Sequence, residues 1–235
     1  MLGFYDYTVW LTYISLMSAV AGIGISLHGA GHPYWGIFFL MLSGLCDAFD
    51  GRVARTKKDR SNTQKAFGIQ IDSLTDVIAF GVLPVCIGES IATIGPEIAG
   101  VTKFMLHSDV ERVVVKTIVI CILMFYVLAA MIRLAYFNVM EEERQKTEDG
   151  CRKTYVGLPV TASALIFPTI LLLQYVISFD ITPIYYMALL VTAVLFLSKI
   201  EVVKPGLRGI LIMVGIGAVE AVLLLLGMFL VEHIR

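Results

Sequence analysis

Long apolar stretches alternate with short polar connections along this sequence. Seven of the stretches are 18 to 30 residues long, and a helix needs about 20 residues to cross the hydrocarbon core of a bilayer. We therefore expect a polytopic membrane protein of the all-α class, built as one helical bundle. The expected spans are residues 8–28, 34–56, 66–92, 110–139, 156–178, 182–199 and 206–231.

Lysine and arginine are distributed unevenly among the connections between these spans. Basic residues are concentrated in every second connection, at 52–65, 140–155 and 199–208. The intervening connections, 29–33, 93–109 and 179–181, contain Lys103 and no other lysine or arginine. Cytoplasmic loops carry an excess of these residues. We therefore expect the amino terminus and the basic connections to face the cytosol, with the protein in the plasma (inner) membrane.

The composition agrees with a membrane protein and gives no sign of a nucleic-acid partner. Hydrophobic residues make up 58% of the chain, compared with about 45–50% in soluble domains. The formal net charge is −1, so no bulk attraction to nucleic acid is expected. The first ten residues lack the basic start of a secretory signal peptide. Their aromatic side chains suit a short helix lying flat at the membrane interface.

Four aspartates stand at the ends of two apolar stretches: Asp47, Asp50, Asp72 and Asp76. Spacings of three and four residues place each pair on one stripe of a helix. An acidic residue inside a membrane helix costs about 2.5–3.5 kcal/mol on insertion scales, so it faces protein or water and indicates function. Converging carboxylates favour bound cations, and all-oxygen ligands suit hard ions such as Mg²⁺, Mn²⁺ or Ca²⁺.

The depth of this predicted site indicates the kind of reaction it serves. A helix over residues 34–56 places Asp47 nine residues from its basic end, or about 14 Å at the rise of an α-helix. The carboxylates then lie below the lipid headgroups, in a water-filled cavity open to the cytosol. A lipid enters such a cavity sideways and a polar molecule enters from the water, so the geometry suits a reaction that joins the two.

The aspartates belong to a longer motif. The chain reads Asp47-x-x-Asp50-Gly51-x-x-Ala54-Arg55 and then Gly68-x-x-x-Asp72-x-x-x-Asp76. This pattern resembles the signature of the CDP-alcohol phosphotransferases at all eight of its fixed positions. Twelve residues separate Arg55 from Gly68, more than is usual in that family, and we interpret the excess as a longer connecting loop.

Three further runs narrow the resemblance. The runs IDSLTDVIAFGVLP at 71–84, RLAYFNV at 133–139 and YVGLPVTASA at 155–164 are similar to the phosphatidylserine synthase branch of that family. The resemblance implies a homodimer, with a six-helix core around a cytosol-facing cavity in each subunit. We expect one domain over 1–235, with its core at about 8–200 and a peripheral span at about 206–231.

The resemblance also implies an activity. It is the transfer of a phosphatidyl group from CDP-diacylglycerol to the hydroxyl of L-serine, with release of CMP, and it requires a divalent metal. We expect two ions, Mg²⁺ or Mn²⁺, with Ca²⁺ as another candidate occupant. The expected metal ligands are Asp47, Asp50, Asp72 and Asp76, and Asp76 is the candidate general base. The residues expected to bind the CDP-lipid are Asp47, Gly51, Ala54, Arg55 and Gly68.

Serine requires a cation for its carboxylate and acceptors for its ammonium group. Arg133 lies within the fourth span, a few residues from its cytosolic end, and is our main candidate for the carboxylate. Snorkelling of its side chain to the interface is the alternative. Further candidates for the acceptor site are Asn138, Arg152, Lys153 and Tyr155.

Other interpretations stay open. Taken singly, Gly51 and Gly68 are typical of helix packing in a membrane bundle. The same chemistry could use another acceptor or donor: glycerol 3-phosphate, an inositol phosphate, or an archaeal-type lipid. A cation transporter also uses intramembrane aspartates, but the third span continues beyond Asp76 as the apolar run VIAFGVLPVCIG. The sequence contains no P-loop, no GxSxG motif and no zinc-type spacing.

Overall fold

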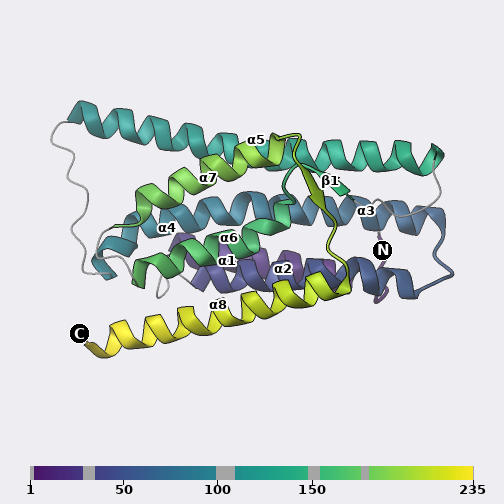
Figure 1. Ribbon diagram of the computed structural model, residues 1–235, viewed down its shortest axis with the longest axis horizontal. Coiled ribbons are helices and arrows are strands. Elements are labelled where there is room, and N and C mark those ends of the chain that lie inside the picture. Colours follow the sequence, from purple (N-terminus) through teal and green to yellow (C-terminus); the bar gives the residue numbers. More distant parts are fainter. Residues whose placement is uncertain (1–2, 29–34, 99–108, 148–153, 176–179, 235) are drawn as a thin grey trace.

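The computed structural model describes residues 3–28, 35–98, 109–147, 154–175 and 180–234. Its helices run along the long axis of the molecule and pack into one bundle (Figure 1). Their bounds are α1 Trp10–His28, α2 Trp35–Thr56, α3 Asn62–Asp76, α4 Leu83–Ile98, α5 Asp109–Thr147, α6 Ser163–Leu172, α7 Thr182–Leu197 and α8 Leu207–Ile234. A π-helical segment, Val77–Val82, joins α3 to α4 without a break.

The predicted all-α bundle is confirmed. Each of the seven predicted spans is occupied by a helix in the described part of the chain, with α3, the π-helical segment and α4 forming one of them. Four stretches are long and apolar enough to cross a bilayer: Trp10–His28, Asn62–Thr93, Val113–Arg144 and Leu207–Leu230. α2 has 22 residues but carries charged side chains in its second half. α6 and α7 belong to shorter apolar segments.

The fifth span begins later than predicted because a short sheet precedes it. Strands β1 (Thr154–Val156) and β2 (Glu201–Val203) pair in an antiparallel ladder. Gly157 then turns the chain with a φ of 78°, a conformation that favours glycine, and donates its N–H to the Ile200 carbonyl at 2.8 Å. A 3₁₀ turn, Val160–Ala162, leads from this corner into α6.

Small hydroxyl side chains hold α1 against α2. Ser15 and Ser43 donate hydrogen bonds to each other's backbone carbonyls, at 3.4 and 3.0 Å. Ser18 donates to the Phe39 carbonyl at 2.9 Å. Small residues allow two membrane helices to approach closely, and their hydroxyl groups find partners across the interface. This contact fixes the position of α2, the helix that carries the first two aspartates.

A buried aromatic cluster supports the helix that carries the other two aspartates. The ring of Tyr126 lies 5.9 Å from that of Phe167 and 5.6 Å from that of Phe196. Its hydroxyl donates to the Phe80 carbonyl at 2.8 Å. In an α-helix this carbonyl would accept from residue 84, but Pro84 has no N–H to give. Tyr126 of α5 therefore supplies a hydrogen-bond donor to a carbonyl of the π-helical segment, which follows directly after Asp76.

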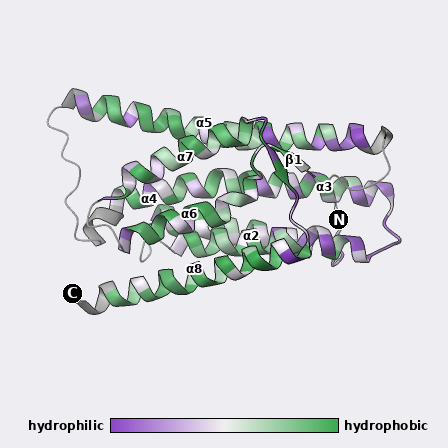
Figure 2. Cartoon of the chain, in the orientation of Figure 1, coloured by the Kyte–Doolittle hydropathy of each residue, from purple (hydrophilic) through white to green (hydrophobic). Residues whose placement is uncertain are grey.

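Hydrophilic residues gather toward the end of the bundle where α2 meets α3 (Figure 2). The connection between these helices, residues 57–61, contains Lys57, Lys58 and Arg60. We call this end of the molecule the basic end. The aspartates lie in the turns of α2 and α3 that approach it.

The prediction of a flat helix over the first ten residues is wrong for the described residues 3–9, which form bends and turns. Asp6 accepts hydrogen bonds from Thr8 and pairs with Lys57 at 2.7 Å. The ring of Phe4 packs edge-on against that of Phe67, with centroids 5.3 Å apart. These contacts draw the segment across the α2–α3 connection, which leaves no regular helix before Trp10 in the part of the chain that the structure describes.

Candidate active site

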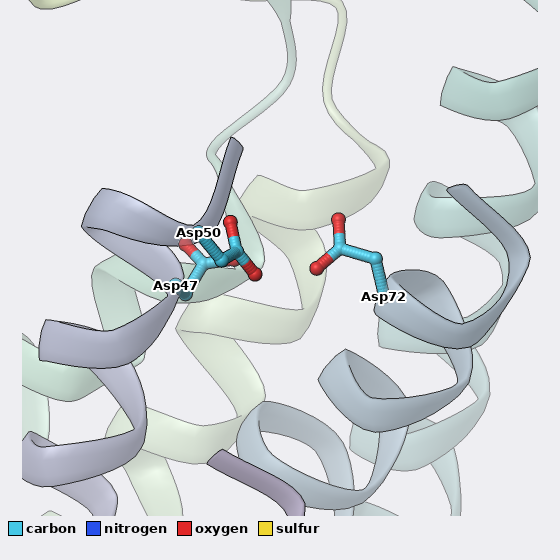
Figure 3. Close-up of side chains that lie close together, drawn as sticks. All are labelled: Asp47, Asp50 and Asp72. Carbon is cyan, nitrogen blue, oxygen red and sulfur yellow. The ribbon is translucent and has the colours of Figure 1, made fainter. Parts of the chain in front are cut away.

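Three carboxylates converge between α2 and α3. Asp47 and Asp50 extend from α2, and Asp72 faces them from α3 (Figure 3). A carboxylate oxygen of each lies within 4.8 Å of those of the other two. The two predicted stripes therefore face each other across one helix interface.

Asp76 extends this group by one turn into the bundle. Its carboxyl lies within hydrogen-bonding reach of Asp47, and that of Asp50 lies within reach of Asp72. The side chains thus form two pairs, each linking α2 with α3, and we call the four residues the acid cluster. Asp50 and Asp76 are only 8% and 7% exposed. Thr12 of α1 donates to Asp50 at 3.3 Å.

The start of α3 sets the direction in which its aspartates point. Ser61 accepts a hydrogen bond from the Gln64 N–H at 3.2 Å, and the Gln64 side chain accepts one from the Ser61 N–H at 3.0 Å. This capping box satisfies backbone donors at the helix start. It fixes the register of the helix, so Asp72 and Asp76 follow on one stripe towards α2.

Glycine and alanine leave room on both helices between the acid cluster and the basic end. A Cβ added at Gly51 would lie 3.6 Å from Nη1 of Arg55, and one added at Gly68 would lie 2.6 Å from Nη2 of Arg60. Each signature glycine therefore has a guanidinium resting over it. Ala54 is partly buried on α2, and Arg55 is exposed and close enough to the acid cluster to act on it electrostatically.

Arg133 of α5 reaches the acid cluster from the other side. It is 8% exposed, and its guanidinium interacts electrostatically with Asp47 and Asp76. Its Cζ atom lies 5.8 Å from the centre of the Phe137 ring, within the range of a cation–π contact. The side chain thus points into the bundle, so the snorkelling alternative does not describe it.

A second polar contact joins α5 to α3. Asn138 donates from Nδ2 to the hydroxyl of Ser73 at 2.7 Å. Ser73 follows Asp72 directly in the chain. Asn138 therefore lies next to the acid cluster, as a neighbour of one of its members.

The remaining candidates for the acceptor site are placed less fully. Arg152 and Lys153 lie outside the described residues. Tyr155 belongs to strand β1, where it is paired with Val202 of β2.

Three neighbours of the site carried no assigned role in the sequence reasoning. They are Thr12, Arg60 and Ser73. Ser73 stands within the D-S-x-x-D run, so the motif itself was a signal for it. Arg60 stands in the lengthened loop, where spacing along the chain says nothing about contacts. Thr12 belongs to a stripe of small polar residues on α1, which helix periodicity could have revealed.

The acid cluster fits a hard divalent cation. Its donor atoms are all carboxylate oxygens, the ligand type that Mg²⁺, Mn²⁺ and Ca²⁺ prefer. The buried arginine that faces it balances only part of its negative charge. Asp47, Asp50 and Asp72 lie close enough together to share one ion, and Asp76 is the adjacent fourth carboxylate.

Several proteins named CDP-diacylglycerol–serine O-phosphatidyltransferase are similar to this chain. One from Saccharomyces cerevisiae is 33% identical over 165 residues, covering 68% of this chain and 51% of its own length. One from Helicobacter pylori is 31% identical over 137 residues, with shares of 58% and 46%. One from Methanocaldococcus jannaschii is 26% identical over 157 residues, with shares of 66% and 56%. The chain therefore spans about half the length of these curated relatives.

No solved structure matches the chain significantly. The family model for CDP-alcohol phosphatidyltransferases matches residues 8–199, a range that contains the complete acid cluster and both signature glycines. The long apolar helices make the protein an integral membrane protein. The chain belongs to the CDP-alcohol phosphatidyltransferase family.

Proposed function

We propose that this protein transfers the phosphatidyl group of CDP-diacylglycerol to the hydroxyl of L-serine, yielding phosphatidylserine and CMP. The observation that carries the proposal is the convergence of Asp47 and Asp50 of α2 with Asp72 of α3, inside the region that matches the family. The choice of serine is supported by the names of the relatives and by an arginine beside the cluster.

The acid cluster would hold one or two divalent ions, with Asp47, Asp50 and Asp72 as ligands and Asp76 beside them. Mg²⁺ or Mn²⁺ bound there would neutralise the pyrophosphate and stabilise the charge on departing CMP. The donor set also accommodates Ca²⁺.

Asp76 is our candidate for the general base. It lies deepest in the cluster and accepts the proton of the serine hydroxyl as the hydroxyl oxygen bonds to the lipid-side phosphorus. The phosphoanhydride bond to CMP breaks in the same displacement, so the phosphatidyl group is conserved and CMP leaves with the bridging oxygen.

The space over the signature glycines would receive the nucleotide. Gly51, Ala54 and Gly68 carry little or no side chain, so the donor approaches the backbone closely. Arg55 offers a planar fork of N–H donors that matches phosphate oxygens. The guanidinium already rests over Gly51, on the side of the cluster that faces the basic end.

Arg133 would bind the carboxylate of serine. Its electrostatic contact with Asp76 brings the hydroxyl of a serine held by Arg133 to the proposed base. The carboxylates of the cluster attract the serine ammonium group. Asn138 would contribute through Ser73, the residue next to Asp72. Tyr155, Arg152 and Lys153 stay candidates for the acceptor site from the sequence alone.

We also propose that the basic end faces the cytosol and that the protein resides in the plasma (inner) membrane. The distribution of Lys and Arg among the connections supports this orientation. A homodimer and a single domain over residues 1–235, with α8 peripheral to the core, follow from the family resemblance. The exposed apolar side chains of α5 and α8 suit contact with lipid or with a second subunit.

The test uses the purified protein in lipid nanodiscs with CDP-diacylglycerol, labelled L-serine and either Mg²⁺ or Mn²⁺. We expect labelled phosphatidylserine and CMP in equal amounts, both abolished by EDTA. Glycerol 3-phosphate, an inositol phosphate and an archaeal-type CDP-lipid are then substituted in turn. Faster CMP release with another acceptor or with the archaeal-type donor would identify that molecule as the substrate in place of the proposed one. Metal flux into liposomes without CMP release would indicate a transporter.

A further inference from the structure

Arg60 lies between the end of α2 and the start of α3. It lies in the lengthened connection, and its guanidinium donates from Nη2 to the Gln64 carbonyl of α3 at 3.1 Å. Nη1 contacts the Ala54 carbonyl of α2 at a longer 3.5 Å. Its Nε–H is buried and has no hydrogen-bond partner among the described residues. This donor is thus unsatisfied and covered in the described structure, so a ligand reaches it only when the guanidinium moves.

The position of this guanidinium relative to the acid cluster follows from helix geometry. Ala54 stands four residues beyond Asp50, and Gly68 stands four residues before Asp72. Four residues are about one helical turn, or about 5.4 Å along the axis. Arg60, which contacts the Ala54 carbonyl and rests over Gly68, thus lies one turn above the cluster on the side of the basic end.

The small signature residues explain why an arginine fits there. A Cβ added at Gly68 would lie 2.6 Å from Nη2 of Arg60, so a larger residue on α3 would displace the guanidinium. Arg55 rests in the same way over Gly51 on α2. Arg55 extends from α2 and Arg60 from the connection that leads to α3, and a phosphate held by a cation at the cluster would extend between them.

We propose that Arg60 is a nucleotide-binding residue. Its guanidinium would break its contact with the Ala54 carbonyl and donate hydrogen bonds instead to the phosphate or base of the CMP portion of CDP-diacylglycerol. This inference rests on the proposed function, because it assigns a contact to the same substrate. Arg60 supplies a fork of charge-assisted donors beside Gly68 of α3. Arg55 supplies the matching fork on the α2 side.

A purely structural role for Arg60 predicts something different. In that case the guanidinium would only link the end of α2 to the start of α3, and its removal would lower thermal stability without changing nucleotide affinity. The nucleotide-binding role changes affinity for CMP and the KM for CDP-diacylglycerol, while the KM for serine and the metal requirement stay the same.

The experiment measures CMP binding by titration calorimetry with Mn²⁺ present, using the full-length protein in nanodiscs. The variants are Arg60→Ala, Arg60→Lys and, as a control, Lys58→Ala, which removes an exposed cation two residues away. We expect about a tenfold weaker CMP affinity in Arg60→Ala and a smaller loss in Arg60→Lys, because lysine keeps the charge but not the fork. Lys58→Ala should match the wild type.

Each outcome decides the proposal. CMP affinity within twofold of wild type in Arg60→Ala, or an equal loss in Lys58→Ala, would overturn it. Should Arg60→Ala not fold, Arg60→Lys gives the decision by the same twofold criterion. A kinetic assay then separates the Arg60 proposal from the proposed function. If CMP affinity falls in Arg60→Ala but the wild type transfers no phosphatidyl group to serine, only the proposed function is contradicted.

Discussion

Asp50 of α2 and Asp72 of α3 face each other within hydrogen-bonding reach across the interface of their helices. Two further carboxylates lie against this pair. Like charges this close repel one another strongly in a poorly solvated site. Four ionised carboxylates without a cation would therefore carry an electrostatic cost, which a bound divalent ion would reduce.

The first prediction concerns thermal stability. Mn²⁺ should raise the melting temperature of the wild type, because a ligand bound at 100 times its Kd stabilises a protein by about 2.7 kcal/mol. Asp72→Asn removes one negative charge, so this variant should melt higher than wild type in EDTA and gain less from Mn²⁺. Thermal unfolding monitored by fluorescence measures both shifts. A full Mn²⁺ shift in Asp72→Asn would count against a shared site.

The second prediction concerns the acceptor. Arg133→Lys keeps the charge but loses the planar fork that pairs with a carboxylate. We expect the KM for serine to rise about tenfold or more, with a much smaller change in the KM for CDP-diacylglycerol. Steady-state kinetics with each substrate varied in turn measures the two constants. Arg144→Lys, on the same helix but paired with Glu141 at 2.7 Å, is the matched control. Equal effects in the two variants would remove Arg133 from the acceptor site.

The third prediction concerns the π-helical segment after Asp76. Tyr126→Phe removes the hydroxyl that donates to the Phe80 carbonyl, and a buried acceptor deprived of its partner costs about 1–3 kcal/mol. We expect a lower melting temperature together with slower CMP release, because the same segment orients α3. Tyr136→Phe, at an exposed position on α5, should behave like the wild type. If Tyr126→Phe had the melting temperature and the rate of CMP release of the wild type, the hydrogen bond would be dispensable.

The fourth prediction concerns pH. The hydrogen bond from Lys57, helped by Thr8, lowers the pKa of Asp6 from 3.8 to about 2. Because the folded value lies below the unfolded one, the pair stabilises the fold fully above about pH 4, and this contribution is lost as the pH falls towards 2. Lys57→Met should thus cost about 0.2–1 kcal/mol between pH 5 and 7, and progressively less below pH 4.

The control for this pH dependence is Lys58→Met. Lys58 is adjacent and exposed, so its loss should leave the melting temperature unchanged throughout. Melting curves recorded from pH 7 down to pH 2.5 provide the comparison. A stability difference between Lys57→Met and wild type that persists unchanged at pH 2.5 would contradict the assigned ion pair.

The arrangement of the bundle could be predicted well from the sequence because hydrophobic length decides where a membrane helix runs. The ends of α1 and α7 lie within a few residues of the predicted spans. The convergence of the aspartates could be predicted because spacings of three and four residues place each pair on one face of its helix. Four acidic side chains within apolar helices also have few stable arrangements in a bilayer.

The contacts that depend on three-dimensional packing could not be predicted in this way. The π-helical segment arises where Pro84 removes a backbone donor and Tyr126, 46 residues from Phe80 along the chain, supplies another. The aromatic residues near the start of the chain suggest an interfacial helix, yet residues 3–9 form bends and turns, and Asp6 of this segment pairs with Lys57. Arg60 lies in a loop with no periodicity, so its position over Gly68 required the folded chain.

The joint role of α2 and α3 is tested most directly by the rate of CMP release from CDP-diacylglycerol with serine and Mn²⁺. Asp50→Asn and Asp72→Asn each remove one ligand, from different helices, and each should slow the reaction at least about 100-fold, a loss of about 2.7 kcal/mol in transition-state stabilisation. Asp59→Asn, an exposed aspartate in the α2–α3 connection, should keep the wild-type rate. If either Asp50→Asn or Asp72→Asn released CMP as fast as Asp59→Asn, the two helices would not form one catalytic centre.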